Sequence, residues 1–170
     1  MHTDSHDEVN VRFATTDDAD SVVGIYNHYV MESTITFEEE GVSASEMARR
    51  IEDVQRASLP WLIAGRSGQV LGYAYATKWH GRSAYRFSTE VTVYVDRAHV
   101  RRGIGSTLYN HLLPTLKSRG IHVALGGIAL PNDASVRLHE RFGFEKVAQF
   151  KEVGFKFGRW IDVGYWQRTL

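Results

Sequence analysis

The spacing of apolar residues along the chain switches between a period of two and a period near 3.6, and each switch predicts a change of element. Residues 9–13 alternate apolar and polar positions, as a short strand does. Two helices are predicted next, with capping residues at 15–18 before the first and a capping box, Ser43 with Glu46, before the second. Their apolar faces consist of Ala19, Val22, Val23, Tyr26 and Val30 in the first helix and of Met47, Ile51 and Val54 in the second.

The middle of the chain is predicted to form strands followed by a third helix. The strands after Pro60 are expected at 61–65, 70–76 and 89–95, and the first two are joined by a hairpin turn at 67–69. The third helix follows Gly103 and ends at Gly120, and one face carries Ile104, Leu108, Leu112 and Leu116. Pro114 lies inside it and is expected to remove a backbone hydrogen bond and bend the helix.

The last third of the chain completes a single mixed α/β domain. Residues 123–130 are nearly all apolar or glycine, as in a buried parallel strand. Asn132-Asp133 caps a short fourth helix that Gly143 closes, and the last strands are predicted at 144–153 and 162–169. The predicted architecture is therefore a sheet covered by helices.

Composition limits the classes of protein to consider. The chain has 170 residues, which fit one domain, predicted at 9–170 after a disordered polar tail at 1–8. The 20 basic and 20 acidic residues cancel, so no overall field favours nucleic acid or an anionic membrane. There is no cysteine, no signal peptide is recognisable, and no apolar run is long enough to span a membrane. We therefore expect a cytoplasmic protein. We also expect no bound metal, because the only histidine pair with the spacing of metal ligands is His2 and His6 in the tail.

A glycine-rich turn at 100–106 separates the strand at 89–95 from the third helix. Gly103 and Gly105 allow backbone N–H groups to approach an anion, and the helix start adds unpaired N–H groups and a positive dipole end. Arg101 and Arg102 can add charged hydrogen bonds to phosphate. The turn is not a Walker A loop or a dinucleotide fingerprint, so a tight connection without a ligand remains an alternative.

Glu90 is the first candidate for catalysis, because it is an acid inside an apolar strand a few residues before this turn. A carboxylate there can accept a proton as a general base. The alternative is an edge-strand glutamate that points to solvent. The combination of a proton acceptor and an anion cradle predicts an enzyme.

The chain is identified as a member of the GNAT superfamily of N-acetyltransferases by two motifs. The strand ending Val93-Tyr94-Val95, followed by the Arg-Arg-Gly-Ile-Gly-Ser turn, resembles the superfamily's acetyl-CoA loop, and 130–144 resembles its asparagine-capped helix leading to Gly-Phe. The resemblance implies a mixed, mostly antiparallel, twisted sheet, splayed around acetyl-CoA and flanked by about four helices.

Further blocks resemble the phosphinothricin N-acetyltransferases and cover 11–167. They include 25–30, 73–76, 106–109 and the tail 154–167. That subfamily acetylates the α-amino group of phosphinothricin, and relatives act on methionine sulfoximine or methionine sulfone. The resemblance implies an acceptor of this type and direct transfer from acetyl-CoA, the co-substrate.

The resemblance also implies roles for individual residues. Glu90 matches the family's base, and His139 its proposed catalytic histidine, although a buried structural histidine is the commoner fate of such a residue. Tyr94 is a possible acid or oxyanion donor, or a core tyrosine. The expected cofactor-binding residues are Val93, Tyr94, Val95, Arg101, Arg102, Gly103, Ile104, Gly105, Ser106, Asn132 and Ser135, with Asn132 also a helix cap.

Substrate recognition is expected in the basic and aromatic segment 78–85. Arg82 and Tyr85 align with the family's substrate contacts, and an Arg fork suits carboxylate or phosphinate oxygens. His80 stands where relatives can place a lysine, which leaves the specific substrate open. Phe37 and Trp160 are expected to line the same pocket, or else to belong to the core.

A homodimer is implied by the resemblance alone, with the tail at 155–160 completing the partner's pocket. Two other functions stay open: acetylation of another amine or of a peptide N-terminus, and a non-catalytic module that binds acyl-CoA. The basic segment 78–85 argues against a polyamine acceptor, and the presence of both Glu90 and His139 argues against a non-catalytic module.

Overall fold

A seven-stranded sheet forms the centre of the molecule in the computed structural model, which describes residues 8–170. The strand order is β1-β2-β3-β4-β5-β7-β6, and every neighbouring pair is antiparallel except β4 and β5. The strands are β1 (Asn10–Phe13), β2 (Trp61–Arg66), β3 (Gln69–Lys78), β4 (Ser88–Val95), β5 (Val123–Ala129), β6 (Glu145–Lys156) and β7 (Arg159–Thr169). The predicted mixed, mostly antiparallel sheet is confirmed.

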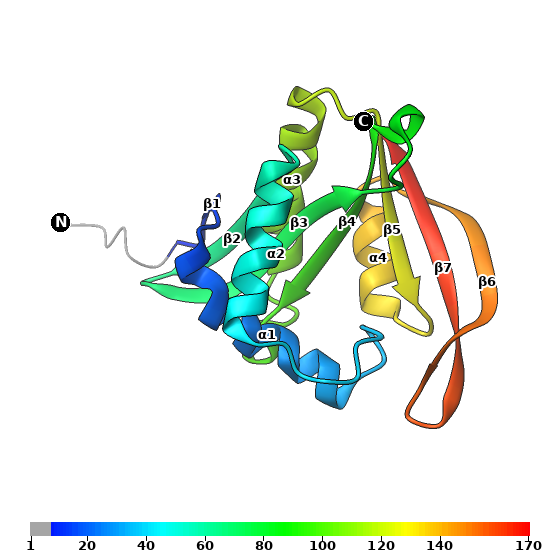
Figure 1. The fold of residues 1–170 in the computed structure, drawn as a ribbon, viewed down its shortest axis with the longest axis horizontal. Helices are drawn as coiled ribbons and strands as arrows, with labels where there is room; N and C mark the ends of the chain where they lie inside the picture. Colours follow the sequence, from blue (N-terminus) through cyan, green and yellow to red (C-terminus); the bar gives the residue numbers. More distant parts are fainter. Residues whose placement is uncertain (1–7) are drawn as a thin grey trace.

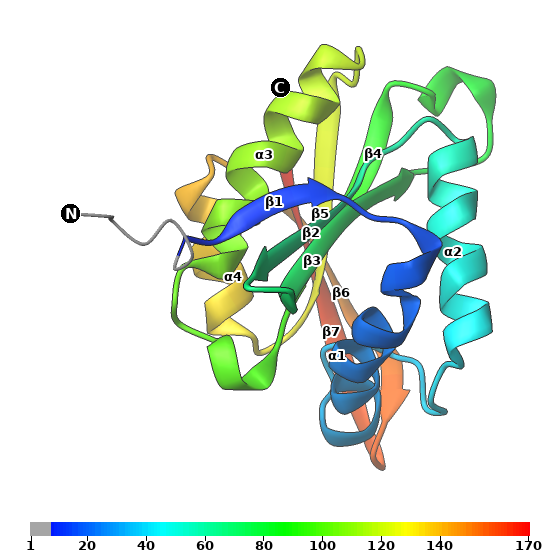
Figure 2. The ribbon, with the colours of Figure 1, turned by 90° about the vertical axis from the view of Figure 1, so that its left-hand side faces the viewer.

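Four α-helices cover the sheet, two on each face (Figures 1 and 2). They are α1 (Ala19–Glu32), α2 (Ala44–Arg56), α3 (Ile104–Ser118) and α4 (Asp133–Arg141). Short 3₁₀ turns lie at Thr16–Asp18, Ser83–Tyr85 and Arg97–His99. None of these helices, within the part of the chain that the structure describes, is long and apolar enough to span a membrane.

The predicted apolar helix faces are the buried ones. Leu108, Leu112 and Leu116 of α3 are fully buried, and Ser43 caps α2 by accepting a hydrogen bond from the Glu46 N–H. The helix α3 continues through Pro114 to Ser118, so the missing N–H does not end it. Of the tail predicted at 1–8, all but Glu8 lies outside the described residues.

The parallel pairing of β4 with β5 is short, and this shapes the site. Only Ser88, Thr89 and Glu90 pair with β5, opposite Val123, Ala124 and Leu125. From Val91 onward, β4 has no partner strand on that side among the described strands, so the backbone groups that face it are available to a ligand, apart from the Val95 carbonyl oxygen, which accepts from the Tyr29 hydroxyl at 2.5 Å.

Two strands differ from those that the sequence predicts. The sequence predicts a buried parallel strand at 123–130, but over its whole length β5 pairs antiparallel with β7, and it pairs parallel with β4 only at Val123–Leu125. Its apolar and glycine-rich composition reflects burial, which does not specify strand direction. The strands predicted at 144–153 and 162–169 are longer and form one hairpin, because Phe157 and Gly158 both adopt positive φ in a tight turn.

Candidate active site

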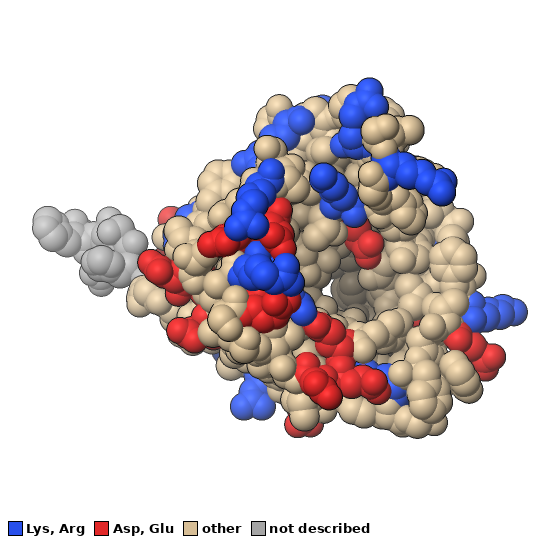
Figure 3. All heavy atoms as spheres, viewed as in Figure 1, with Lys and Arg blue, Asp and Glu red and all other residues tan. Residues whose placement is uncertain are grey.

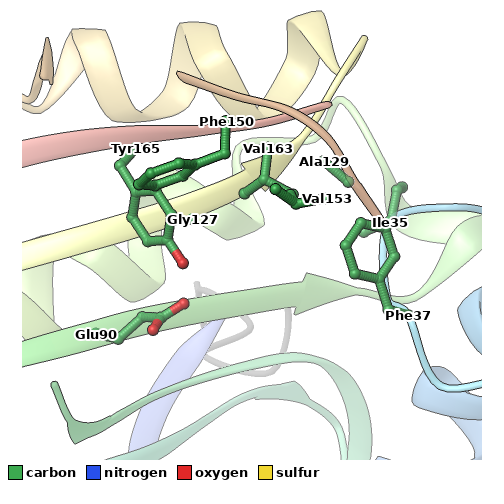
Figure 4. A pocket seen from close by; sticks show the side chains of 9 residues that line it. All are labelled: Ile35, Phe37, Glu90, Gly127, Ala129, Phe150, Val153, Val163 and Tyr165. Atoms are coloured by element: carbon green, nitrogen blue, oxygen red, sulfur yellow. The ribbon is translucent and has the colours of Figure 1, made fainter. Parts of the chain in front are cut away.

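Glu90 lies in a cavity of about 430 Å³ on the α1 and α2 side of the sheet. Figure 4 shows its carboxylate pointing into this space from β4, and the face drawn in Figure 3 is hollowed between its α2 side and its β6–β7 side. The other lining residues are Ile35, Phe37, Gly127, Ala129, Phe150, Val153, Val163 and Tyr165. Because β4 is an inner strand, the alternative of an edge-strand glutamate is wrong.

Burial controls the acidity of Glu90. The apolar walls raise the pKa of Glu90 above its ordinary value, because desolvation penalises the charged form, and His80 opposes part of this shift. Within residues 8–170 no hydrogen bond to the carboxylate oxygens of Glu90 is present, so both oxygens are available to a ligand in the cavity. The group has the properties of a general base.

A larger cavity, of about 750 Å³, surrounds the glycine-rich turn. Its walls include Val93, Tyr94, Val95, Arg101, Gly103, Ile104, Gly105, Ser106, Asn132 and Ser135. Ile35 lines both this cavity and the Glu90 cavity, so the two are adjacent. Of the residues predicted to bind the cofactor, only Arg102 does not line this space, and it is exposed.

The turn has the form of an anion cradle. Gly103 precedes α3 in the left-handed conformation, with φ at 79°, and a Cβ placed on it would point into open space. The first N–H groups of α3, those of Ile104, Gly105 and Ser106, have no acceptor within the helix, whereas the Thr107 N–H already donates to the Gly103 carbonyl oxygen at 2.9 Å. A diphosphate fits this geometry, because it would accept those N–H groups at the positive end of the helix dipole. Asn132 caps α4 by accepting from the Ser135 N–H at 3.2 Å.

His139 is a buried residue of α4. Its side chain is 3% exposed, its Nε2 lies 3.0 Å from the Tyr109 hydroxyl oxygen, and its Nδ1 lies 2.8 Å from the Ser135 carbonyl oxygen. It lines neither cavity. Both ring nitrogens are therefore engaged, and burial lowers the pKa of His139, which favours the neutral ring. The geometry supports a structural histidine.

Tyr94 lies four residues after Glu90 on β4, on the same face of the sheet. Its ring packs against Tyr26, Tyr29 and Tyr73, with centroid separations of 5.2, 5.3 and 5.6 Å. Burial raises the pKa of Tyr94, so the phenol keeps its proton. It is partly buried, packs against the hydrophobic core and lines the glycine-rich cavity.

The residues predicted to recognise the substrate are only partly brought together. Phe37 lines the Glu90 cavity, whereas Arg82 and His80 line a separate cavity with Lys78. Tyr85 contacts His80, with ring centroids 5.0 Å apart. Trp160 is 63% exposed and packs on Phe155, outside the cavity of its own chain, because it follows the turn of the long β6–β7 hairpin.

Sequence reasoning missed a buried lysine that joins two walls of the Glu90 cavity. Lys156 is 1% exposed, and its Nζ donates to the carbonyl oxygens of Val30 at 2.7 Å and Thr36 at 2.9 Å. The same hairpin meets the loop again at Gly154, where a Cβ would lie 2.4 Å from the Phe37 ring. Lys156 therefore fastens the hairpin to the loop that carries Phe37.

Replacing Lys156 with methionine is expected to lower the free energy of unfolding by about 2 kcal/mol. The stem length is kept, but two buried carbonyl groups lose their donor, and each unsatisfied group costs about 1–3 kcal/mol before relaxation. Urea unfolding measures the effect, with the exposed Lys151→Met on the same strand as control. Equal stability of the two variants would show that the ammonium does not hold the loop.

Metal chemistry receives no support from the described residues. Within 8–170, no group of three or more His, Cys, Asp or Glu side chains could hold a metal ion. His2 and His6 lie outside the described residues.

The comparisons with known proteins agree with this geometry. A family model described as an acetyltransferase (GNAT) domain matches residues 11–164. The chain is 44% identical to the phosphinothricin N-acetyltransferase of Streptomyces viridochromogenes, over 95% of this chain and 88% of the relative. It is 35% identical to the L-methionine sulfoximine/L-methionine sulfone acetyltransferase of Salmonella typhimurium, over 95% of each chain.

A solved structure has the same fold as this chain. It is a phosphinothricin acetyltransferase from Sinorhizobium meliloti in complex with acetyl-CoA, and it superposes with a TM-score of 0.92 at 34% identity, over 95% of this chain and 88% of the other. The predicted fold and superfamily are both confirmed. The chain belongs to the GNAT family of acetyltransferases.

Proposed function

We propose that this protein is an N-acetyltransferase that moves the acetyl group of acetyl-CoA to the α-amino group of a small amino-acid-like acceptor. The acceptor class, of the phosphinothricin, methionine sulfoximine or methionine sulfone type, comes from the names of the relatives. One observation supports the chemistry most: a carboxylate of raised pKa lies in a cavity that adjoins an anion cradle at Ile35.

Acetyl-CoA is held, in this proposal, by the glycine-rich cavity. The N–H groups of Ile104, Gly105 and Ser106 and the Arg101 side chain receive the diphosphate, and Arg102 adds charge from outside the cavity. The backbone groups of Val93 bind the pantetheine arm on the side of β4 that lacks a partner strand, whereas Val95 contributes its N–H to the acetyl end of the cofactor, because its carbonyl oxygen accepts from the Tyr29 hydroxyl. Asn132 and Ser135 border the same cavity from α4.

Glu90 is assigned as the base. The acceptor amine gives up a proton to the carboxylate and forms a bond to the acetyl carbon, while the carbon–sulfur bond of the thioester breaks and the thiolate leaves. The neutral Tyr94 phenol is the proposed proton donor to that thiolate, and the Val95 N–H group the proposed donor to the oxyanion. No step is assigned to His139.

The acceptor side chain contacts Phe37 in the Glu90 cavity. Arg82, His80 and Tyr85 approach from the neighbouring loop and attract the acceptor's negative groups, although Arg82 lines a different cavity in this structure. Burial raises the Glu90 pKa, and the charge interaction with His80 opposes part of this effect.

The proposal extends to a homodimer that uses the β6–β7 hairpin. Large apolar side chains are exposed along this hairpin: Val147, Phe150, Val153, Phe155, Phe157 and Trp160. An exposed apolar patch of this kind is typical of a protein interface. In a dimer, Trp160 would reach the partner's pocket, which explains why it does not line its own.

Replacing Trp160 with aspartate is expected to shift the protein from dimer to monomer, because a charge would be buried at the interface. Sedimentation velocity at micromolar concentration measures the change, with Phe13→Asp as a control on the opposite edge of the sheet. A wild-type protein that sediments as a monomer would contradict the dimer.

The function is tested by measuring CoA release from acetyl-CoA in the presence of phosphinothricin, methionine sulfoximine or methionine sulfone. Release with at least one acceptor, and a product acetylated on nitrogen, is the expected result. If the protein binds acetyl-CoA but none of the three acceptors reacts, the acceptor class is wrong. Acetylation of another amine, or binding without catalysis, would then be the better account.

A further inference from the structure

Tyr165 stands opposite Glu90 in the same cavity, and we propose that its hydroxyl group and the Glu90 carboxylate together bind the amine of the acceptor. This inference rests on the proposed acetyl transfer and adds a second residue that touches the reacting nitrogen. Figure 4 shows the phenol oxygen pointing across the cavity toward the Glu90 side chain.

The sheet explains why the two groups meet. Tyr165 on β7 is the direct partner of Gly127 on β5, and Glu90 on β4 is the partner of Leu125, two residues earlier on the same face of β5. Glu90 and Tyr165 therefore flank β5 from its two sides. At Gly127 no side chain stands between them.

The distances around Gly127 locate the meeting point. A Cβ placed on Gly127 would lie 3.0 Å from Glu90 Oε1 and 3.1 Å from Tyr165 Cε1. The carboxylate and the edge of the phenol thus converge on the space above this glycine. A group the size of an amine, placed a little farther into the cavity, would be within reach of both.

The Tyr165 hydroxyl is free to bind a ligand, and its ring is held in place. Within residues 8–170 this hydroxyl has no hydrogen-bond partner. The ring packs edge-on against Trp79 and Phe150, with centroids 5.3 and 5.8 Å away, so the direction of the hydroxyl is set before any ligand enters. A polar group held in position by packing is what an amine site needs.

The chemistry of the pair suits a primary amine. Burial, and then the charge of Glu90, raise the pKa of Tyr165, so the phenol remains neutral and its oxygen accepts a hydrogen bond. Glu90 takes the proton that the amine must lose, and Tyr165 accepts a second N–H. This fixes the direction of the nitrogen lone pair toward the thioester. An N-methylated amine has one N–H fewer and satisfies the pair less well.

The test compares Tyr165→Phe with the wild type, with methionine sulfone and its N-methyl derivative as acceptors. The ring is kept, so packing on Trp79 and Phe150 persists. We expect kcat/KM for methionine sulfone to fall at least tenfold, the KM for acetyl-CoA to stay unchanged, and the preference for the primary amine to shrink. A tenfold loss corresponds to about 1.4 kcal/mol, the size expected for one hydrogen bond between neutral groups.

Tyr73→Phe is the matched control, because Tyr73 is a buried tyrosine on the same sheet that lies outside the Glu90 cavity. Its kcat/KM is expected to remain within twofold of wild type. An equal loss in both variants, or an unchanged preference between the two amines in Tyr165→Phe, would overturn the proposal.

Two readouts separate this inference from the proposed function. If the wild type is active and Glu90→Gln is not, but Tyr165→Phe behaves as the wild type, the Tyr165 role alone is wrong. If the wild type neither acetylates nor binds, by calorimetry, any of methionine sulfone, methionine sulfoximine and phosphinothricin, the acceptor class and the Tyr165 role are both wrong.

Discussion

Replacing Glu90 with glutamine is expected to lower kcat at least about 100-fold, while the Kd for acetyl-CoA stays unchanged. Glutamine keeps the shape of the side chain but cannot accept the amine proton, and general-base catalysis typically contributes about 10²–10⁴ in rate. Steady-state rates of CoA release, together with acetyl-CoA binding by calorimetry, measure the two quantities separately. The exposed Glu145→Gln serves as the control.

The pH profile provides a second test of the same residue. Burial raises the pKa of Glu90, so its carboxylate becomes protonated at a higher pH than an ordinary carboxyl group does. The protonated form cannot act as a base. The rate should therefore rise with pH through this raised pKa, and the acidic limb should be absent from Glu90→Gln. An acidic limb of the same midpoint in both proteins would assign the base to another group.

Replacing Gly103 with valine is expected to raise the Kd for acetyl-CoA at least tenfold. Gly103 has φ of 79°, which costs an L-residue about 1–2 kcal/mol, and a β-branched side chain would enter the space that the diphosphate needs. Calorimetric titration with CoA measures the change.

Gly68→Val separates steric exclusion from backbone strain. Gly68 has a similar φ of 81° and equally open surroundings, but it lies in the hairpin turn between β2 and β3, outside both cavities. We expect it to lower stability with no change in CoA affinity. Equal CoA affinity in Gly103→Val and wild type would contradict the cradle.

Sequence patterns predicted most of the helices and strands, because caps and apolar spacing depend on residues that are close together in the chain. Helix caps such as Ser43 and the i+4 leucines of α3 depend on neighbours within one or two turns, and the structure has these elements where the spacing placed them. The pairing direction of β5 could not be predicted from its own residues. It depends on β7, some 40 residues later, and its composition reports burial rather than direction.

The site divides in the same way. Glu90 and the glycine-rich turn are close in sequence, so one short stretch of the chain predicted both of them. In the structure the two cavities that they line are adjacent. Tyr165 and Lys156 become important only through pairing of β5 with β7 and of the hairpin with the α1–α2 loop, which no short motif encodes. The position of Trp160 outside its own cavity was also not predictable from a short motif, because the register of the β6–β7 hairpin determines where its side chain lies.

The position of the diphosphate and of the thioester tests the account most directly. We predict that a crystal structure with CoA and an acceptor places the diphosphate on the N–H groups that open α3, and the sulfur beside the cavity that Glu90 and Tyr165 share. Phosphates bound at any other surface, or a sulfur atom remote from the Glu90 carboxylate, would contradict it.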